Sequence, residues 1–274
     1  MAKTIFVLLD GCGYQTAGEN LGYAEHLVEA GQGAKYRVLG ELPSSSRPMY
    51  ETLLTSLPAY VHGIAGNMTA RPSRCEHIFG LCRRAGLTTA AAAYSWMCEL
   101  YLEAPFDPAR NRLRFGADAP IQNGIFYFED GYPDSHVFAD AEYLRKTYCP
   151  DFLLVHTMSI DAAGHRGTSA GAEYARAAAG AGMMLSLTLP VWLAEGYRVV
   201  VAADHGMDGF GLHGGNTPAQ RETALYLFAD TARKGDRTRE AITQLLVAPL
   251  LCACLGIAPA PGMRPIAEVS FFEG

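Results

Sequence analysis

Four short apolar runs, separated by longer segments with helical spacing, constrain the fold of this 274-residue chain more than any other feature. The runs are Ile5–Leu9, Thr88–Ala93, Phe152–His156 and Arg198–Ala203. Uninterrupted apolar runs of this length are typical of strands buried on both faces, as in parallel sheets. Strands that alternate with helices predict a mostly parallel sheet covered by helices on both sides. The predicted fold class is therefore α/β, in the form of a three-layer α/β/α sandwich.

The segments between these runs carry apolar residues at helical spacing. The predicted helices are Met49–Ser56, Arg74–Ala85, Ala139–Tyr148, Ala170–Ala194 and Arg239–Leu255. The segment Pro105–Asp134 is rich in turn residues, charges and aromatic side chains, which predicts a small cap or insert near the edge of the active site. The length of the chain suits one α/β domain, so we expect a single domain over residues 1–274.

Charge and composition exclude several classes of partner. The formal net charge of −6 disfavours attraction to nucleic-acid polymers or to anionic membranes, because both need a basic face. The apolar stretch Leu245–Ala258 is shorter than a membrane span and contains Pro249. The seven cysteines lack the paired spacing of a zinc ribbon or a disulfide framework. We therefore expect a cytoplasmic protein that binds neither nucleic-acid polymers nor membranes.

Carboxylates and imidazoles follow three of the four predicted strands. Ligand sites of α/β sheets lie at the carboxyl ends of the strands, so side chains that follow different strands can converge there. A mixed set of oxygen and nitrogen ligands suits zinc or a similar divalent ion. Each residue alone is more often a turn former, a helix cap or a structural histidine, but six of them would be enough for two metal ions. The candidates are Asp10, Asp161, His165, Asp204, His205 and His213.

These motifs occur in an order that resembles the alkaline phosphatase superfamily, and within it the type I phosphodiesterase/nucleotide pyrophosphatase family. That family has a hydroxyl nucleophile, a proline two residues later, and a downstream "HGI" followed by an asparagine. The stretch "SSSRPMYETLLTSLPAYVHGIAGN" matches this pattern without a gap, with Ser46 at the nucleophile, Pro48 at the proline and Asn67 at the asparagine. The resemblance extends to "CPDFLLVHTMSIDAAGH" and "HGGNTPAQRETALYLFA", and so covers most of the chain.

The resemblance implies two divalent ions, with Zn²⁺ expected first and Mn²⁺ or Fe as alternatives. One ion would be held by Asp161, His165 and His213. The second would be held by the other three candidates, Asp10, Asp204 and His205, together with the oxygen of Ser46.

The resemblance also implies a reaction. Ser46, activated by a metal ion, would attack phosphorus and form a covalent phosphoseryl or nucleotidyl-seryl intermediate, which water would hydrolyse. The amide of Asn67 would donate a hydrogen bond to a non-bridging phosphate oxygen. The expected activity is that of a phosphodiesterase or nucleotide pyrophosphatase. The expected substrate is a small-molecule phosphate ester, a nucleotide or a phosphonate.

Two residues depart from the family pattern. The family usually has a threonine nucleophile followed by an aromatic residue that packs on a nucleobase, where this chain has Ser46 and Arg47. The planar cation of Arg47 suits a phosphate, so we predict that it binds substrate, the competing interpretation being a solvated surface arginine. This substitution favours a phosphomonoesterase or phosphonate hydrolase as the alternative activity.

Other branches of the superfamily fit less well. Sulfatases need an arginine where this chain has Tyr50, and cofactor-independent phosphoglycerate mutases carry a second large domain of which this chain has no trace. A non-catalytic alternative is a metal-stabilised binding domain. A missing ligand or nucleophile would favour that alternative, and none is missing from the sequence.

Overall fold

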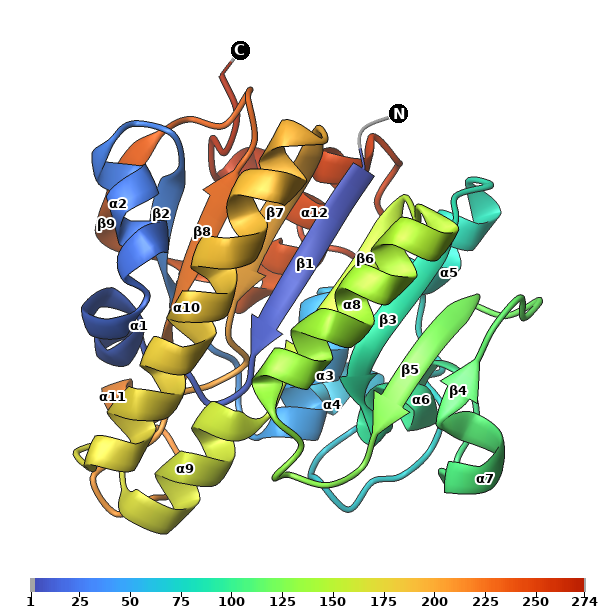
Figure 1. Cartoon of the computed structure of the whole chain (residues 1–274), viewed down its shortest axis with the longest axis horizontal. Coiled ribbons are helices and arrows are strands. Elements are labelled where there is room, and N and C mark those ends of the chain that lie inside the picture. Colours follow the sequence, from blue (N-terminus) through green and yellow to red (C-terminus); the bar gives the residue numbers. More distant parts are fainter. Residues whose placement is uncertain (1–2, 274) are drawn as a thin grey trace.

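A nine-stranded sheet forms the centre of the computed structural model, which describes residues 3–273 (Figure 1). The strand order is β4-β5-β3-β6-β1-β7-β8-β2-β9. The five strands from β5 to β7 in this order run parallel, and only β4 and β8 pair antiparallel with their neighbours. The strands are β1 (Lys3–Leu9), β2 (Ala34–Leu39), β3 (Thr89–Tyr94), β4 (Leu113–Arg114), β5 (Asn123–Tyr127), β6 (Phe152–Thr157), β7 (Tyr197–Ala202), β8 (Glu222–Phe228) and β9 (Gly235–Thr243).

Helices cover both faces of the sheet (Figure 1). One layer packs on the side drawn in front and consists of α1 (Tyr14–Asn20), α2 (Gly22–Glu29), α8 (Asp134–Tyr148), α9 (Ser159–Gly167) and α10 (Ala172–Ala194). The layer behind the sheet includes α3 (Ser46–Thr55), α4 (Ala59–His62), α5 (Ile78–Arg84), α6 (Ser95–Tyr101) and α12 (Val247–Leu255). Short helices in connecting segments are α7 (Pro108–Asn111), α11 (Pro218–Arg221), η1 (Gln244–Leu246) and η2 (Ile266–Glu268).

Two hydrophobic cores lie on the two faces of the sheet. Successive side chains of a strand point to opposite faces, and β1 is buried on both. Phe6 and Leu8 belong to the core shared with α3, α5 and α12, whereas Ile5, Val7 and Leu9 belong to the core shared with α2, α8 and α10. This burial on both sides explains why the strand reads as an uninterrupted apolar run. The predicted three-layer α/β/α class is confirmed.

The four apolar runs predicted as strands are β1, β3, β6 and β7. The predicted helix Arg239–Leu255 is wrong over its first residues, because the chain up to Thr243 continues β9. The rest is helical, as the 3-10 turn η1 (Gln244–Leu246) followed by α12. β9 lies at the edge of the sheet and carries charged side chains, so its sequence lacks the apolar run of a central strand. The predicted helix Arg74–Ala85 is shorter than expected, since α5 begins only at Ile78.

The segment Pro105–Asp134 contains α7, β4 and β5. β5 pairs with β3 and so extends the sheet at one edge, with β4 outside it. The tips of this segment, including Phe115 and Phe128, are exposed. The segment predicted as a small cap or insert therefore contributes strands to the sheet as well as loops at its edge.

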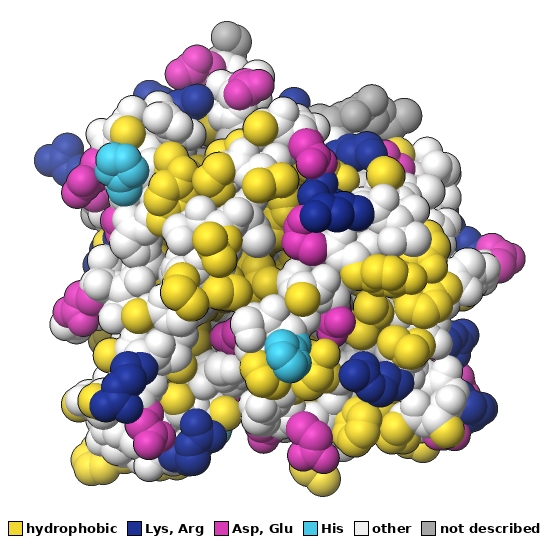
Figure 2. All heavy atoms as spheres, viewed as in Figure 1, with side chains coloured by type: hydrophobic (Ala, Val, Ile, Leu, Met, Phe, Trp, Pro, Cys, Tyr) yellow, Lys and Arg dark blue, Asp and Glu magenta, His cyan; other side chains and the backbone are white. Residues whose placement is uncertain are grey.

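Helix α10 is the longest element of the structure and lies along the front of the sheet. Among residues 3–273 it is the one helix whose length and apolar composition would suit a membrane span. Its inner face, which includes Leu185 and Trp192, packs against β7 and neighbouring helices. Its outer face exposes Met183, Leu187 and Val191, and Figure 2 shows apolar side chains gathered on this side of the molecule.

The start of α8 contains a buried acid whose ionisation is coupled to folding. Asp134 is 8% exposed, and its Oδ1 accepts a hydrogen bond from the backbone N–H of Ser159 at 3.3 Å. Burial raises the pKa of Asp134 to about 6. Because this value exceeds that of an unfolded aspartate, the stability that Asp134 contributes is complete below about pH 4 and is lost as the pH rises through about 6.

We expect Asp134→Asn to remove this dependence, since asparagine keeps the acceptor oxygen without a charge. Wild type should lose about 3 kcal/mol of unfolding free energy relative to the variant between pH 4 and pH 7, from about two pKa units at about 1.4 kcal/mol each. Urea unfolding of both proteins at the two pH values measures the difference. A difference that does not change with pH would contradict the assignment.

Candidate metal centre and active site

Three neighbouring parallel strands bring three aspartates together at their carboxyl ends. Asp10 follows β1 directly, Asp204 follows β7 after one residue, and Asp161 lies in the first turn of α9, just after β6. Because β6, β1 and β7 are adjacent, these loops meet at one edge of the sheet. All three carboxylates are buried, with Asp10 and Asp204 fully shielded from solvent.

Gly11 allows this close approach. It has a φ of +71°, and a Cβ at this position would lie 2.8 Å from the Cα of Asp161. Its N–H donates a hydrogen bond to Oδ1 of Asp204 at 3.1 Å. A side chain at this position would therefore push the loop after β1 away from α9.

Three histidines point their Nε2 atoms into the same cluster. Each Nδ1 lies within hydrogen-bond distance of a backbone carbonyl, which can only accept, so each Nδ1 carries a proton and each Nε2 presents a lone pair when the ring is neutral. The pairs are His165 with Gly211 at 2.9 Å, His205 with Gly206 at 3.0 Å, and His213 with Ser44 at 3.2 Å. Metal-bound histidines are commonly oriented in this way.

The side chains divide into two groups. In the first, Nε2 of His165 lies 3.1 Å from Nε2 of His213 and 3.4 Å from Asp161. In the second, Nε2 of His205 lies 3.3 Å from Asp204 and 3.5 Å from Asp10. The ring of His205 stacks on that of His213 with centroids 3.9 Å apart, so His205 is also within reach of the first group. The structure thus brings together all six predicted metal ligands.

The donor atoms of this cluster fit divalent cations. Asp10 Oδ1, Asp161 Oδ1 and Asp204 Oδ2 are buried without a hydrogen-bond partner among the described residues. The Nε2 lone pairs of His165 and His213 face each other at 3.1 Å, which is unfavourable unless a cation lies beside them. Carboxylate oxygens and imidazole nitrogens together suit zinc or a similar ion.

The pKa values of the carboxylates and of His165 depend on the other charges in the cluster. Burial, together with the neighbouring acids, raises the pKa of Asp10 well above its usual value, and burial raises that of Asp204 to about 7. Burial alone would also raise the pKa of Asp161, but its hydrogen bond with His165 and the nearby histidines bring it below its usual value. That hydrogen bond raises the pKa of His165 to about 8. Without a metal ion, a proton would take the place of the cation.

Ser46 lies at the first position of α3, next to the second group. Its Oγ is 3.1 Å from Nε2 of His205, and the residue is 2% exposed. The positive end of a helix dipole favours negative charge on nearby oxygens. The predicted nucleophile is therefore adjacent to the predicted ligands Asp10, Asp204 and His205.

Asn67 lies in the loop after α4 and contacts the residue next to Ser46. Its Oδ1 accepts a hydrogen bond from the backbone N–H of Arg47 at 3.0 Å. This bond fixes which side of the amide faces the helix and leaves the Nδ2 group as a donor. The structure thus places Asn67 beside the predicted nucleophile.

Arg47 is buried, at 2% exposure, so the interpretation as a solvated surface arginine is wrong. Its Nη2 donates to Glu99 at 2.7 Å, and its guanidinium lies over the ring of Trp96, 4.5 Å from the centroid. Its Nε and Nη1 have no partner among the residues described. Both atoms are shielded from solvent, so a substrate oxygen would reach them only after side chains move. Substrate binding by Arg47 remains a prediction.

Sequence reasoning missed two neighbours of Asp10. The hydroxyl of Tyr50 donates a short hydrogen bond to Oδ2 of Asp10, and Nε2 of His156 lies 3.4 Å from the same oxygen. The spacing offered one signal, because Tyr50 is four residues after Ser46 and so lies on the same face of α3. His62, the histidine of the "HGI" motif, follows no strand and has other partners. Its Nε2 pairs with Thr52, and its Nδ1 accepts from the N–H of Ile64.

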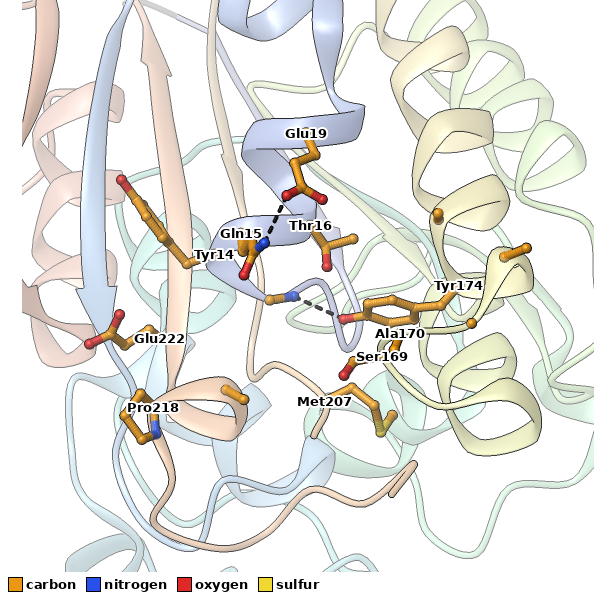
Figure 3. A pocket seen from close by; sticks show the side chains of 15 residues that line it. Tyr14, Gln15, Thr16, Glu19, Ser169, Ala170, Tyr174, Met207, Pro218 and Glu222 are labelled. Atoms are coloured by element: carbon orange, nitrogen blue, oxygen red, sulfur yellow. Dashed lines mark hydrogen bonds between the residues drawn. The ribbon is translucent and has the colours of Figure 1, made fainter. Parts of the chain in front are cut away.

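A cavity of about 670 Å³ lies beside the loop that carries Asp10 and is shown in Figure 3. Tyr174, from α10, forms part of its wall. The Tyr174 hydroxyl accepts from the N–H of Gly13 at 3.1 Å and donates to the carbonyl of Gly11 at 2.5 Å. α10 thereby supports the loop after β1 from the side of the sheet opposite Ser46.

The fold and this cluster define an α/β/α protein with a candidate two-metal centre at the carboxyl edge of its sheet. Solved structures with this fold include murine ectonucleotide pyrophosphatase/phosphodiesterase 5, one of them an inactive variant in complex with AMP. That variant is 14% identical, with a TM-score of 0.76 and coverage of 97% of this chain and 98% of the other. The human protein of the same name is 14% identical, with a TM-score of 0.74 and the same coverages.

Phosphonoacetate hydrolase from Sinorhizobium meliloti 1021, in complex with phosphonoformate, is 21% identical with a TM-score of 0.57. That alignment covers 75% of this chain and 56% of the hydrolase. No protein-family model and no curated protein sequence matches the chain. The structural similarities show that the chain has the alkaline phosphatase-like fold, as the sequence resemblance implied.

We expect the wild-type protein to retain two divalent ions per chain after gel filtration, as measured by elemental analysis. Asp161→Asn should release one of them, because it weakens one group and leaves Asp10, Asp204 and His205 intact. Asp118→Asn is the matched control, since Asp118 is exposed and pairs with Arg83 rather than with a predicted ligand. Wild-type protein without bound metal, even after incubation with Zn²⁺ or Mn²⁺, would contradict the assignment.

Proposed function

We propose that the chain is a metal-dependent hydrolase of phosphoric esters, of the phosphodiesterase/nucleotide pyrophosphatase type, with Ser46 as its nucleophile. The observation that carries this proposal is the position of Ser46. Its Oγ lies 3.1 Å from Nε2 of His205 and beside the carboxylates of the second ligand group. The likeness in fold to proteins named as a phosphodiesterase and a phosphonate hydrolase supports the same chemical class.

The proposal assigns the six ligands to two ions, with Zn²⁺ expected first and Mn²⁺ or Fe as alternatives. Asp161, His165 and His213 would hold one ion, and Asp10, Asp204 and His205 would hold the other. When bound, such ions stabilise the deprotonated serine oxygen and neutralise charge on the phosphate.

The residues of the chain supply position and hydrogen bonds. Ser46 Oγ attacks phosphorus and displaces the alcohol, which leaves with the proton of the serine hydroxyl. The product on the protein is a phosphoseryl or nucleotidyl-seryl ester, which water then hydrolyses. The positive end of the α3 dipole would lie near the oxygens of this ester. Nδ2 of Asn67, oriented by the bond between its Oδ1 and Arg47, donates to a non-bridging oxygen as charge develops there.

The proposed substrate is a small-molecule phosphate ester or nucleotide. The neighbouring structures contain AMP and phosphonoformate, two small anions with a phosphorus centre. Arg47 favours a second candidate, a phosphomonoester or phosphonate, because the N–H groups on its two unpartnered nitrogens would suit the additional charge of such substrates once neighbouring side chains move.

We expect wild-type protein to hydrolyse bis-(p-nitrophenyl) phosphate and Ser46→Ala to lose at least about 10³-fold in kcat, because alanine has no oxygen with which to attack phosphorus. Ser45→Ala is the matched control, since it removes the neighbouring hydroxyl from the same serine run and should stay within a few-fold of wild type. Release of p-nitrophenol measures both.

Two results would revise the proposal. Turnover of p-nitrophenyl phosphate alone would replace the phosphodiesterase with a phosphomonoesterase. Two bound ions without hydrolysis of any mono-, di- or pyrophosphate ester would leave a metal-stabilised binding domain.

Asn67→Asp tests the donor role without disturbing the loop, because aspartate keeps the oxygen that accepts from the N–H of Arg47. We expect kcat to fall about 100-fold, equivalent to about 3 kcal/mol of transition-state stabilisation, with a much smaller change in metal content. Steady-state kinetics combined with elemental analysis separate the two effects. An unchanged kcat would exclude Asn67 from the reaction.

A further inference from the structure

We propose that Tyr50 and His156 are positioning residues that hold Oδ2 of Asp10 and thereby reserve its Oδ1 for a metal ion. This inference rests on the metal site of the proposed function and adds two residues to it. Neither residue belongs to the predicted ligand set.

The geometry around Asp10 is asymmetric. Oδ2 accepts a short hydrogen bond from the Tyr50 hydroxyl and lies 3.4 Å from Nε2 of His156. Oδ1 has no hydrogen-bond partner among the described residues and lies 3.5 Å from Nε2 of His205. One carboxylate oxygen is therefore occupied by protein donors, and the other faces the cluster of ligands.

The tautomer of His156 supports this role. Its Nδ1 lies 3.4 Å from the backbone N–H of Tyr94 at the end of β3, and a backbone N–H can only donate. Nδ1 is therefore the acceptor, and the ring proton is on Nε2, the nitrogen that faces Asp10. This arrangement is the reverse of that in His165, His205 and His213, whose Nε2 atoms are free to bind metal. His156 is thus a donor to a ligand rather than a ligand.

The sheet and α3 fix both donors on one side of Asp10. His156 pairs in register with Leu8, and the alternation along β1 places Asp10 on the same face as Leu8. That face is covered by α3, which carries Tyr50. The rings of Tyr50 and His156 meet edge to face, with centroids 4.7 Å apart. Both residues are fully buried, so bulk water does not compete with them for this oxygen.

Two donors on one oxygen restrict rotation of the carboxylate about its Cβ–Cγ bond. A free carboxylate can turn either oxygen to an ion or present both, and the orientation that binds must then be selected at an entropic cost. Tyr50 and His156 remove that choice before an ion arrives. Loss of residues that orient a metal ligand typically lowers metal affinity about 10- to 100-fold.

The test is the Zn²⁺ affinity of each site, measured by competition with a chromophoric chelator. Tyr50→Phe removes only the hydroxyl, and we expect it to weaken one of the two zinc-binding steps about 10- to 100-fold while the other stays within two-fold. The same substitution in an Asp161→Asn background, which retains the Asp10 group, assigns the weakened step. Tyr226→Phe is the matched control, because it removes a buried hydroxyl that donates to Glu25 rather than to a predicted ligand.

His156 provides a second, independent comparison. Gln can present an N–H donor near the position of Nε2, whereas Met of similar size cannot, and both lose the acceptor for Tyr94. We expect His156→Gln to keep zinc affinity close to that of wild type and His156→Met to lose it as Tyr50→Phe does. Circular dichroism checks that each variant is folded.

The outcomes separate this inference from the proposed function. The positioning role is overturned if Tyr50→Phe leaves zinc affinity unchanged or weakens both zinc-binding steps equally. It is also overturned if Tyr226→Phe loses as much affinity as Tyr50→Phe does. In each case the hydrolase assay still tests the proposed function. Wild-type protein that binds two zinc ions without hydrolysing any ester overturns the function and leaves the zinc comparison valid. Wild-type protein that binds none of Zn²⁺, Mn²⁺ and Fe²⁺ overturns both.

Discussion

Burial of three carboxylates at one point is the constraint on which the rest of the structure depends. Asp10, Asp161 and Asp204 converge because β6, β1 and β7 are neighbours, and their mutual repulsion away from water must be compensated. The surrounding contacts hold the three carboxylates together and orient the side chains around them. Gly11 lets two of the loops touch, backbone carbonyls orient three histidines, and α3 brings Ser46 to the same place. A fold that separated the three strands by one further strand would lose the site.

The centre of the fold could be predicted from the sequence because its signals are local. Strands buried on both faces read as apolar runs, and the residues after β1, β6 and β7 are the aspartates of the cluster. The edge strands could not be predicted in the same way. β9 pairs with β2 at the edge of the sheet and carries charged residues, so its end lacks the apolar run of a buried strand. The predicted helix Arg239–Leu255 therefore begins too early, and its helical part is η1 and α12.

The site shows the same division between local and long-range information. The ligands and the stretch from Ser46 to Asn67 lie in short motifs, which a family resemblance can align residue by residue. The contacts of Tyr50 and His156 with Asp10, and of Arg47 with Glu99, join residues 40 to 146 positions apart. No spacing rule specifies such pairs, because they depend on which helix lies over which strand. The burial of Arg47 could not be foreseen for the same reason.

The wide separation of the ligands along the chain has a consequence for how the protein is made. Asp10 is synthesised early, whereas Asp204 and His213 follow only after most of the sheet. Until then the three parallel strands cannot be neighbours, and no nascent fragment contains a complete ligand group. The proposed metal centre could therefore be completed only late in synthesis, after Asp204, His205 and His213 have been added.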